Sequence, residues 1–227
     1  MVSGSPSGTI AVAARPTAPG GRDGRGVVLP AAGAPAAEVL GEVTLEGRFG
    51  IVLTRLDGPT LLQLLRTGAM ASQQAGAILA TLAISVHKTP PPPEDGLCHC
   101  DLHPGNVIMT ADGPRLIDWL GMVRAPAALD LGACHILLSE IAPELVENPE
   151  RPRALNVAVQ SEYARLAGMS PAALTAAIEP YLPIVRVFAL LGGVFPAQRE
   201  RLIQRVEAAL CSEDEQQAFD DRSALGA

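Results

Sequence analysis

Three polar residues in the middle of the chain have side chains and a spacing that suit metal and proton chemistry. Asp101 carries a carboxylate that can orient a hydroxyl and accept its proton, and Asn106, five residues later, offers a neutral carboxamide oxygen to Mg²⁺. Asp118 follows an apolar stretch, twelve residues after Asn106, and offers a charged oxygen. Phosphoryl transfer depends mainly on positioning and charge neutralisation. The spacing therefore predicts Asp101 as a base and the other two residues as magnesium ligands.

The segment from His99 to Asn106 resembles the catalytic loop of aminoglycoside phosphotransferases and of related choline and small-metabolite kinases, usually written H-G-D-x-x-x-x-N. Ile117-Asp118-Trp119 is similar to the I-D-W of the same family. A weaker resemblance extends over residues 39–210. It implies a protein-kinase-like fold, ATP and Mg²⁺ as cofactors, and transfer of the γ-phosphoryl group of ATP to a hydroxyl of a small molecule, aminoglycoside-like or another polar metabolite.

The resemblance also implies roles for residues around the loop. Asp130, in Leu129-Asp130-Leu131-Gly132, matches the acid that braces the loop, and His99 is expected to be a structural anchor. His103 occupies the position where many protein kinases carry a lysine that contacts the transferred phosphate, and a hydrogen-bonding role within the loop explains it equally well. Cys100 replaces the usual glycine, so a positive φ at this position would strain the backbone.

The nucleotide side of the expected site is less complete. Residues 49–58 resemble the strand and hinge on which the adenine lies. The expected nucleotide contacts are Val52, Leu53, Thr54 and Leu56. The family also places a glycine-containing phosphate loop and a lysine before the hinge, whereas Lys88 is the only lysine of this chain. An alternative therefore stays open, namely a catalytically inactive pseudokinase that acts as a nucleotide- or protein-binding module.

The cysteines predict free thiols. Four cysteines have no regular spacing and no accompanying signal peptide, which is typical of a reducing, cytoplasmic protein: Cys98, Cys100, Cys134 and Cys211. A zinc site at Cys98-His99-Cys100 with His103 is the alternative, but ligands crowded into six residues cannot converge tetrahedrally without a strained loop. We therefore expect no bound zinc.

The elements that must position these residues begin with strands. Residues 39–45 and 49–54 read as a hairpin whose second strand is central, and residues 9–13 and 26–29 are further short β-like runs. Residues 97–109 and 114–118 read as a loop with short strands around a turn at 111–113.

Helices make up the rest of the expected fold. Thr60 is expected to cap a helix, and the clearest helix covers residues 72–87, with Ser72 as its N-cap and Pro90 beyond its end. The later helices are expected at 129–140, at 154–167, after Ser170 with Pro171 in the first position, at 183–191 and at 196–210.

This order of elements indicates an α+β, protein-kinase-like architecture. A reduced β lobe with the hinge would cover residues 1–57, a mainly helical catalytic lobe residues 58–212, and a disordered polar tail residues 213–227. The chain of 227 residues is 48% hydrophobic, which is enough for a substantial core. Its net charge of −7 provides no general basic field, so no nucleic-acid partner is expected.

Two expectations concern the helical part. The nearest approach to a membrane span, residues 183–196, is broken by Arg186 and two glycines, so no membrane partner is expected. Four glutamates make one region acidic and would suit a cationic aminoglycoside acceptor, although a solvated helix surface explains them as well: Glu140, Glu144, Glu147 and Glu150. The acceptor and the oligomeric state stay open.

Overall fold

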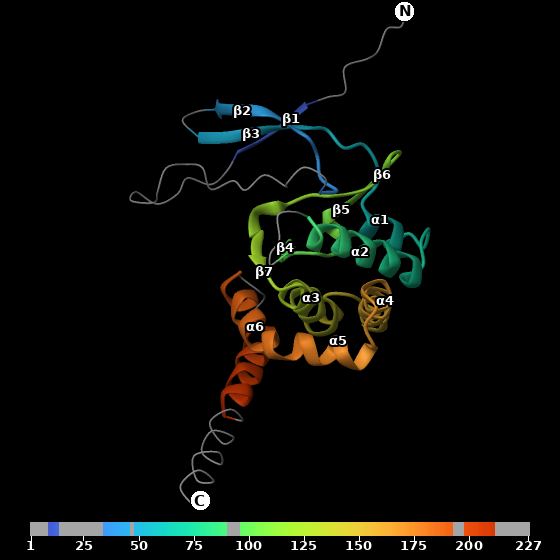
Figure 1. Ribbon diagram of the computed structural model, residues 1–227, viewed down its shortest axis with the longest axis vertical. Coiled ribbons are helices and arrows are strands. Elements are labelled where there is room, and N and C mark those ends of the chain that lie inside the picture. Colours follow the sequence, from blue (N-terminus) through green and yellow to red (C-terminus); the bar gives the residue numbers. More distant parts are fainter. Residues whose placement is uncertain (1–8, 14–33, 46–47, 90–95, 193–197, 212–227) are drawn as a thin grey trace, which may run out of the picture.

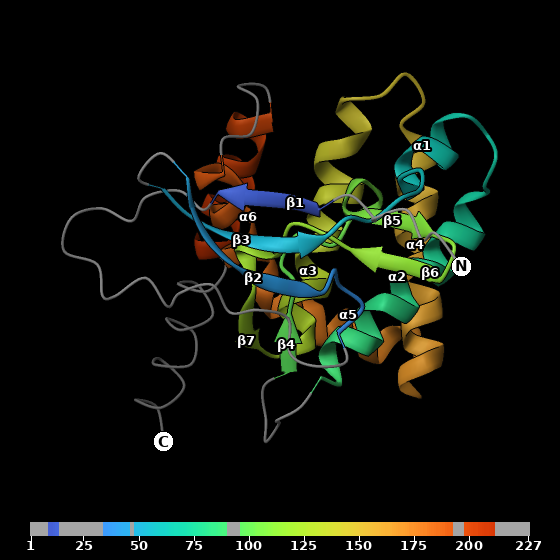
Figure 2. The same ribbon diagram turned by 90° about the horizontal axis from the view of Figure 1, so that it is seen from above.

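The computed structural model describes residues 9–13, 34–45, 48–89, 96–192 and 198–211. A small sheet lies at one end of the molecule and helices lie at the other, with two short strand pairs between them (Figure 1). The view from above shows the sheet lying over these strand pairs and the helices (Figure 2). The described chain is thus a mixed helix-and-strand structure with small sheets, as expected for an α+β protein.

The small sheet contains strands β1 (Thr9–Ala13), β2 (Val39–Leu45) and β3 (Arg48–Thr54) in the order β1-β3-β2, all antiparallel. The predicted hairpin and its central second strand are confirmed. Between residues 39 and 44, exposed residues alternate with partly buried ones, which is the period of a strand with one covered face. The β-like run predicted at 26–29 lies outside the described residues.

Two helices follow the sheet, α1 (Leu61–Arg66) and α2 (Ser72–His87). Thr60 caps α1 as predicted, because its side chain accepts from the N–H of Gln63 while the Gln63 side chain accepts from the N–H of Thr60. The bounds of α2 are as predicted, but Ser72 is not its N-cap. Ala71 holds the extended cap position, and the side chain of Gln74 accepts its N–H in place of a side-chain cap.

Two antiparallel strand pairs join the sheet to the helices. Strand β4 (Gly96–Cys98) pairs with β7 (Val123–Ala125), and β5 (Val107–Thr110) pairs with β6 (Gly113–Leu116). The short strands around the turn at 111–113 were expected, whereas β7 was not.

The β5–β6 hairpin is hydrogen-bonded along both of its edges. The N–H of Leu116 donates to Pro35 at 2.6 Å, and that of Met109 donates to Pro59 at 2.9 Å. Gly58 has φ 152°, and a Cβ on it would lie 2.1 Å from the carbonyl oxygen of Met109. Only glycine fits this contact, which fixes the segment after β3 against the hairpin.

The remaining helices of the described residues agree in number with those predicted from the sequence, but not in every boundary. They are α3 (Ala127–Ile136), the π turn η3 (Leu137–Ile141), the 3₁₀ turn η4 (Ala142–Glu144), α4 (Glu150–Ala167), α5 (Pro171–Ile178), the 3₁₀ turn η5 (Glu179–Tyr181), α6 (Leu182–Leu191) and a helical run at 198–211. The helix expected at 129–140 starts earlier and ends in a π turn, and α4 starts at Glu150 rather than at residue 154. The Ser170 cap with Pro171 at the first position is confirmed.

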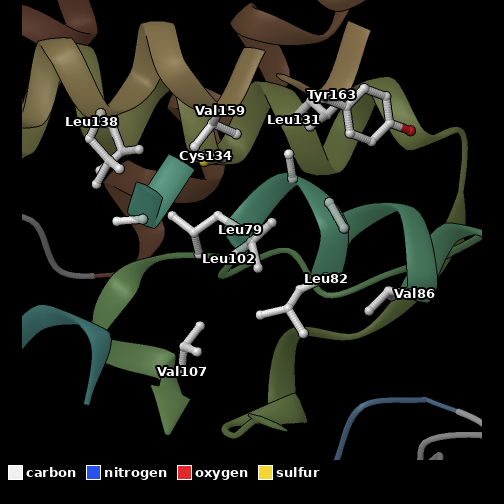
Figure 3. Packing of buried hydrophobic residues seen from close by; sticks show 14 of the residues in the cluster. Leu79, Leu82, Val86, Leu102, Val107, Leu131, Cys134, Leu138, Val159 and Tyr163 are labelled. Atoms are coloured by element: carbon white, nitrogen blue, oxygen red, sulfur yellow. The ribbon is translucent and has the colours of Figure 1, made fainter. Parts of the chain in front are cut away.

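The core forms where α2 packs against α4 and α3. Gly76 of α2 permits this close approach, because a Cβ on it would lie 2.4 Å from the Cβ of Ala158 on α4. Figure 3 shows Leu79, Leu82 and Val159 among the side chains that meet there. Leu102 joins the same cluster and is 1% exposed, a burial that contributes about 1.5–3 kcal/mol. The residue that follows Asp101 is therefore anchored in the core.

One continuous helical stretch, and not residues 183–196, comes nearest to a membrane span among the described residues. Residues Pro171–Leu191 are long and apolar enough to cross a membrane by length and composition, with a mean hydropathy of 1.5. In this structure Leu174, Ile178 and Val185 of the stretch are buried in the helical core. Arg186 forms an ion pair with Glu140 at 2.9 Å. These contacts pack one side of the stretch against the helical core, while only 17% of its apolar window is buried.

Candidate active site

The β5–β6 hairpin brings Asn106 and Asp118 to the same place. Asn106 directly precedes β5 and Ile117 directly follows β6, and the N–H of Ile117 donates to the carbonyl of Asn106 at 2.9 Å. Asp118 is the next residue, has φ 61° and ψ 65°, and exposes its side chain. The two residues, twelve positions apart, thus lie at one end of a two-stranded ladder.

Asp101 lies in the same loop with both carboxylate oxygens approached by nitrogen atoms. The Nδ2 of Asn106 donates to Oδ2 of Asp101 at 2.8 Å and to its backbone carbonyl at 3.0 Å. The Nε2 of His103 lies 3.5 Å from Oδ1, and the Asp101 side chain is 48% exposed. The neighbouring His103 side chain is the main cause that lowers the pKa of Asp101, with a further contribution from Asn106, while partial burial opposes it. The group is therefore an ionised, accessible carboxylate.

His99 connects the loop to the residues around Asp118. Its Nε2–H donates to the carbonyl of Ile117 at 3.0 Å, and its Nδ1 accepts from the N–H of Asp101 at 3.3 Å. The imidazole lies against the ring of Trp119, with centroids 4.7 Å apart. Burial lowers the pKa of His99, so the ring is neutral and has one N–H donor.

Asp130 of α3 hydrogen-bonds to the backbone of the loop that carries Asp101. Its Oδ1 accepts the N–H of Cys100 at 2.7 Å, and its Oδ2 accepts the N–H of His99 at 3.2 Å and Nε2–H of His87 at 2.9 Å. The Asp130 side chain is 1% exposed. A buried carboxylate is tolerated only when such donors replace water, so Asp130 and the loop stabilise each other.

Sequence reasoning missed His87 and Tyr163, which complete this network. His87 is the last residue of α2, and its Nδ1 lies 2.8 Å from the hydroxyl of Tyr163 on α4. No signal in the sequence pairs these helices, because the contact depends on tertiary packing. One ligand atom from each of His87, Cys98 and Asp130 lies within 4.8 Å of the others, a spacing that could hold a metal. However, three N–H groups already bind the carboxylate of Asp130, so we interpret the cluster as a hydrogen-bond network and not as a metal site.

Cys100 has φ 62°, in the left-handed region that favours glycine. The strain foreseen for a non-glycine residue at this position is therefore present, at a cost of roughly 1–3 kcal/mol. The four cysteines are free. Burial raises the pKa of Cys98 and of Cys100 to about 12, so both are protonated thiols and poor metal ligands. His99 uses Nε2 for the Ile117 carbonyl and Nδ1 for the Asp101 N–H, which leaves no ring nitrogen for the considered zinc set.

The expected nucleotide contacts lie at the end of β3 and just after it. Val52 and Leu53 are paired with both neighbouring strands, and Leu56 follows the strand. Thr54 donates its N–H to Glu38 at 2.9 Å and accepts the Glu38 N–H on its side chain at 2.9 Å. The backbone of β3 thus forms hydrogen bonds with the strands on both of its sides. Only the hinge segment after Thr54 lies outside this strand pairing. The edge strand β1 contains no basic residue.

Two of the four glutamates of the acidic region, Glu140 and Glu144, form internal ion pairs. Glu140 is 6% exposed and binds Arg186 at 2.9 Å and Arg205 at 2.5 Å. Glu144 pairs with Arg201 of the helical run at 198–211 and accepts from Gln198 at 3.0 Å. These carboxylates fasten the last described helix to η3 and η4. Glu147 and Glu150, in contrast, are exposed.

The comparison with known proteins covers the part of the chain that contains this site. Residues 85–169 match the model of the phosphotransferase enzyme family. The matched segment contains the loop with Asp101 and Asn106 as well as Asp118 and Asp130, and it ends just after α4. No curated protein matches the chain. Residues 85–169 of this chain are therefore similar to the phosphotransferase enzyme family.

Proposed function

We propose that this protein is an ATP-dependent phosphotransferase of protein-kinase-like fold that transfers the γ-phosphoryl group to a hydroxyl of a small polar molecule. The observation that carries the proposal is the joint placement of three oxygen-bearing side chains. Asn106 hydrogen-bonds to Asp101, and the base of the hairpin joins Asn106 to the residue before Asp118. The family match supports the reaction class.

Asp101 would engage the acceptor. Its carboxylate is ionised, half-exposed and held from two sides, which is the arrangement needed to orient a hydroxyl group and accept its proton. The fixed orientation matters more than high basicity, because positioning supplies most of the catalysis in phosphoryl transfer.

The donor set near Asp101 fits magnesium. The Nδ2 of Asn106 donates to Asp101, so its carboxamide oxygen is the atom left for a ligand, and Asp118 exposes a carboxylate. Hard oxygen donors of this kind suit Mg²⁺. When bound with nucleotide, the ion would neutralise charge on the phosphates. Asn106 and Asp118 would hold it.

The nucleotide would lie along Val52, Leu53, Thr54 and Leu56. The strand β1, paired with β3, has the sequence Thr-Ile-Ala-Val-Ala and supplies no cation for the phosphates. Loss of one such preorganised charge lowers rates by on the order of 10² to 10³. We therefore expect slow turnover.

The lack of a basic residue in β1 also favours a second candidate function, an inactive pseudokinase that binds nucleotide or protein. This alternative explains the absence of a basic residue in β1. It does not explain why the loop retains Asp101, Asn106 and Asp118 together, because a binding module needs no base. We therefore favour the enzyme.

A transfer assay with γ-labelled ATP tests the proposal. The parent and Asp118→Ala would be screened against hydroxylated metabolites and aminoglycosides, and thermal melting with and without Mg-ATP would be followed in parallel. The proposal expects a labelled product from the parent alone and a melting shift that Asp118→Ala loses. A Mg-ATP shift without any labelled product supports the pseudokinase, and the absence of both contradicts nucleotide use.

A further inference from the structure

The ring of His103 is fixed by its immediate neighbours. His103 is the N-cap of the 3₁₀ turn η1 (Pro104–Asn106), with φ −152° and ψ 166°, and its Nδ1 accepts the N–H of Gly105 at 3.0 Å. A Cβ on Gly105 would lie 2.7 Å from Cε1 and 2.9 Å from Nδ1 of the imidazole. The ring therefore lies closely over the glycine, and a side chain there would displace it.

This contact determines which nitrogen of the neutral ring carries the proton. Nδ1 is an acceptor, so the hydrogen of a neutral imidazole must be on Nε2. Nε2 in turn lies 3.5 Å from Oδ1 of Asp101, while Nδ2 of Asn106 donates to Oδ2 at 2.8 Å. Asp101 thus has one N–H donor beside each carboxylate oxygen.

We propose that His103 is a positioning residue that acts through Asp101: its Nε2–H sets the rotation of the carboxylate, so that a free lone pair is directed at the acceptor hydroxyl. The inference rests on the proposed phosphotransferase function. Without the His103 donor, only Asn106 would restrain the carboxylate, and the half-exposed group would turn about its last torsion. A separation of 3.5 Å is long for a hydrogen bond, and bonds of this kind commonly shorten when substrate binds.

Two substitutions separate this role from simple support of the loop. In His103→Asn, the side-chain oxygen can take the place of Nδ1 and still accept from Gly105, but the donor toward Asp101 is lost. In His103→Gln, the longer side chain can place an N–H near Asp101, but the cap on Gly105 is lost. His103→Ala removes both interactions.

The kinetic constants of the three variants test the proposal. We expect His103→Asn to melt near the parent and to keep the KM for ATP, with kcat lower by on the order of 10- to 100-fold, because orientation errors near the reacting atoms have effects of this size. His103→Gln should recover much of the kcat that His103→Ala loses, in spite of a lower melting temperature. Parental kcat in His103→Asn, or no recovery in His103→Gln, overturns the proposal.

A second measurement does not require turnover. Nitrogen NMR of histidine-labelled parent protein in alkaline buffer reports the tautomer of each neutral ring. The proposal requires the Nε2–H tautomer for His103, assigned by its absence in His103→Gln, and an Nδ1–H tautomer overturns it whatever the kinetics show. A parent with the expected tautomer but no phosphoryl transfer would instead count against the proposed function, and with it against the catalytic role of His103.

Discussion

The buried carboxylate of Asp130 accepts the N–H of Cys100 at 2.7 Å, across thirty positions of sequence. Cys100 has φ 62°, a conformation that costs free energy for any residue with a side chain. The residue next to Asp101 is thus strained, and a charge from α3 helps to hold it. The backbone of the loop is fixed before any ligand binds.

Asp130→Asn should destabilise the protein strongly. The amide keeps the shape but replaces one acceptor oxygen by a donor, which would face the N–H groups of the loop or of His87. We expect a loss of about 2–4 kcal/mol in the free energy of unfolding, measured by urea titration. Asp57→Asn is the matched control, because its ion pair with Arg55 is exposed and should contribute less than about 1 kcal/mol. Equal losses in the two variants would contradict the bracing role.

Cys100→Gly should be more stable than Cys100→Ala. Both variants remove the thiol, but only glycine relieves the left-handed strain, worth about 1–2 kcal/mol. Part of this gain, roughly 0.5–1 kcal/mol, is offset by the greater backbone freedom of glycine in the unfolded chain. Differential scanning calorimetry of the two variants checks the order of their melting temperatures, and a more stable Cys100→Ala would show that the loop carries no strain there.

Gly58→Ala should disrupt the contact between the hinge segment and the β5–β6 hairpin. The new Cβ would lie 2.1 Å from the carbonyl oxygen of Met109, so the backbone must shift. We expect the free energy of unfolding to fall by about 1–3 kcal/mol and Mg-ATP to bind more weakly. Thermal melting with and without nucleotide measures both effects. Gly41→Ala in β2 is the control, because its Cβ would meet nothing within 4 Å. The prediction fails if the two variants behave alike.

His135 should make stability depend on pH. Burial is the main cause that lowers its pKa from the usual value of 6.5; Arg186 and Arg205 also lower it and Glu140 opposes them. Between 6.5 and the lower folded value, only the unfolded chain binds the proton, so stability falls as the pH falls through this window. His135→Asn keeps an acceptor for the side chains of Asn156 and Gln160 but does not titrate. Melting temperatures from about pH 8 to about pH 5 should therefore fall less steeply for this variant. Parallel curves would contradict the prediction.

The local part of the candidate site could be predicted from the sequence because it depends on short-range geometry. Asp101 and Asn106 share one loop, and the turn at Asp112-Gly113 returns the chain so that Ile117, the residue before Asp118, hydrogen-bonds to Asn106. The β2–β3 hairpin and the capping of α1 by Thr60 were predictable for the same reason, since each depends on neighbours in the chain.

The long-range part could not be predicted from the residues alone. The contacts of His87 with Asp130 and Tyr163 join three helices, and no periodicity in one helix specifies its partners. Asp130 was found only through the family resemblance. The π turn at Leu137–Ile141 was missed as well: it places Glu140 against Arg186 and Arg205, a tertiary constraint that helix propensity does not contain.

The measurement that tests the central claim most directly compares the parent with Asp101→Asn. Turnover with the best acceptor from the screen, or with water, would be measured beside the Kd for Mg-ATP. Asparagine keeps the shape and the contact partners Asn106 and His103 but removes the proton acceptor and the charge. The account predicts that kcat falls by on the order of 10² or more while the Kd changes little. Equal turnover in the two proteins would show that Asp101 is not the base of the reaction.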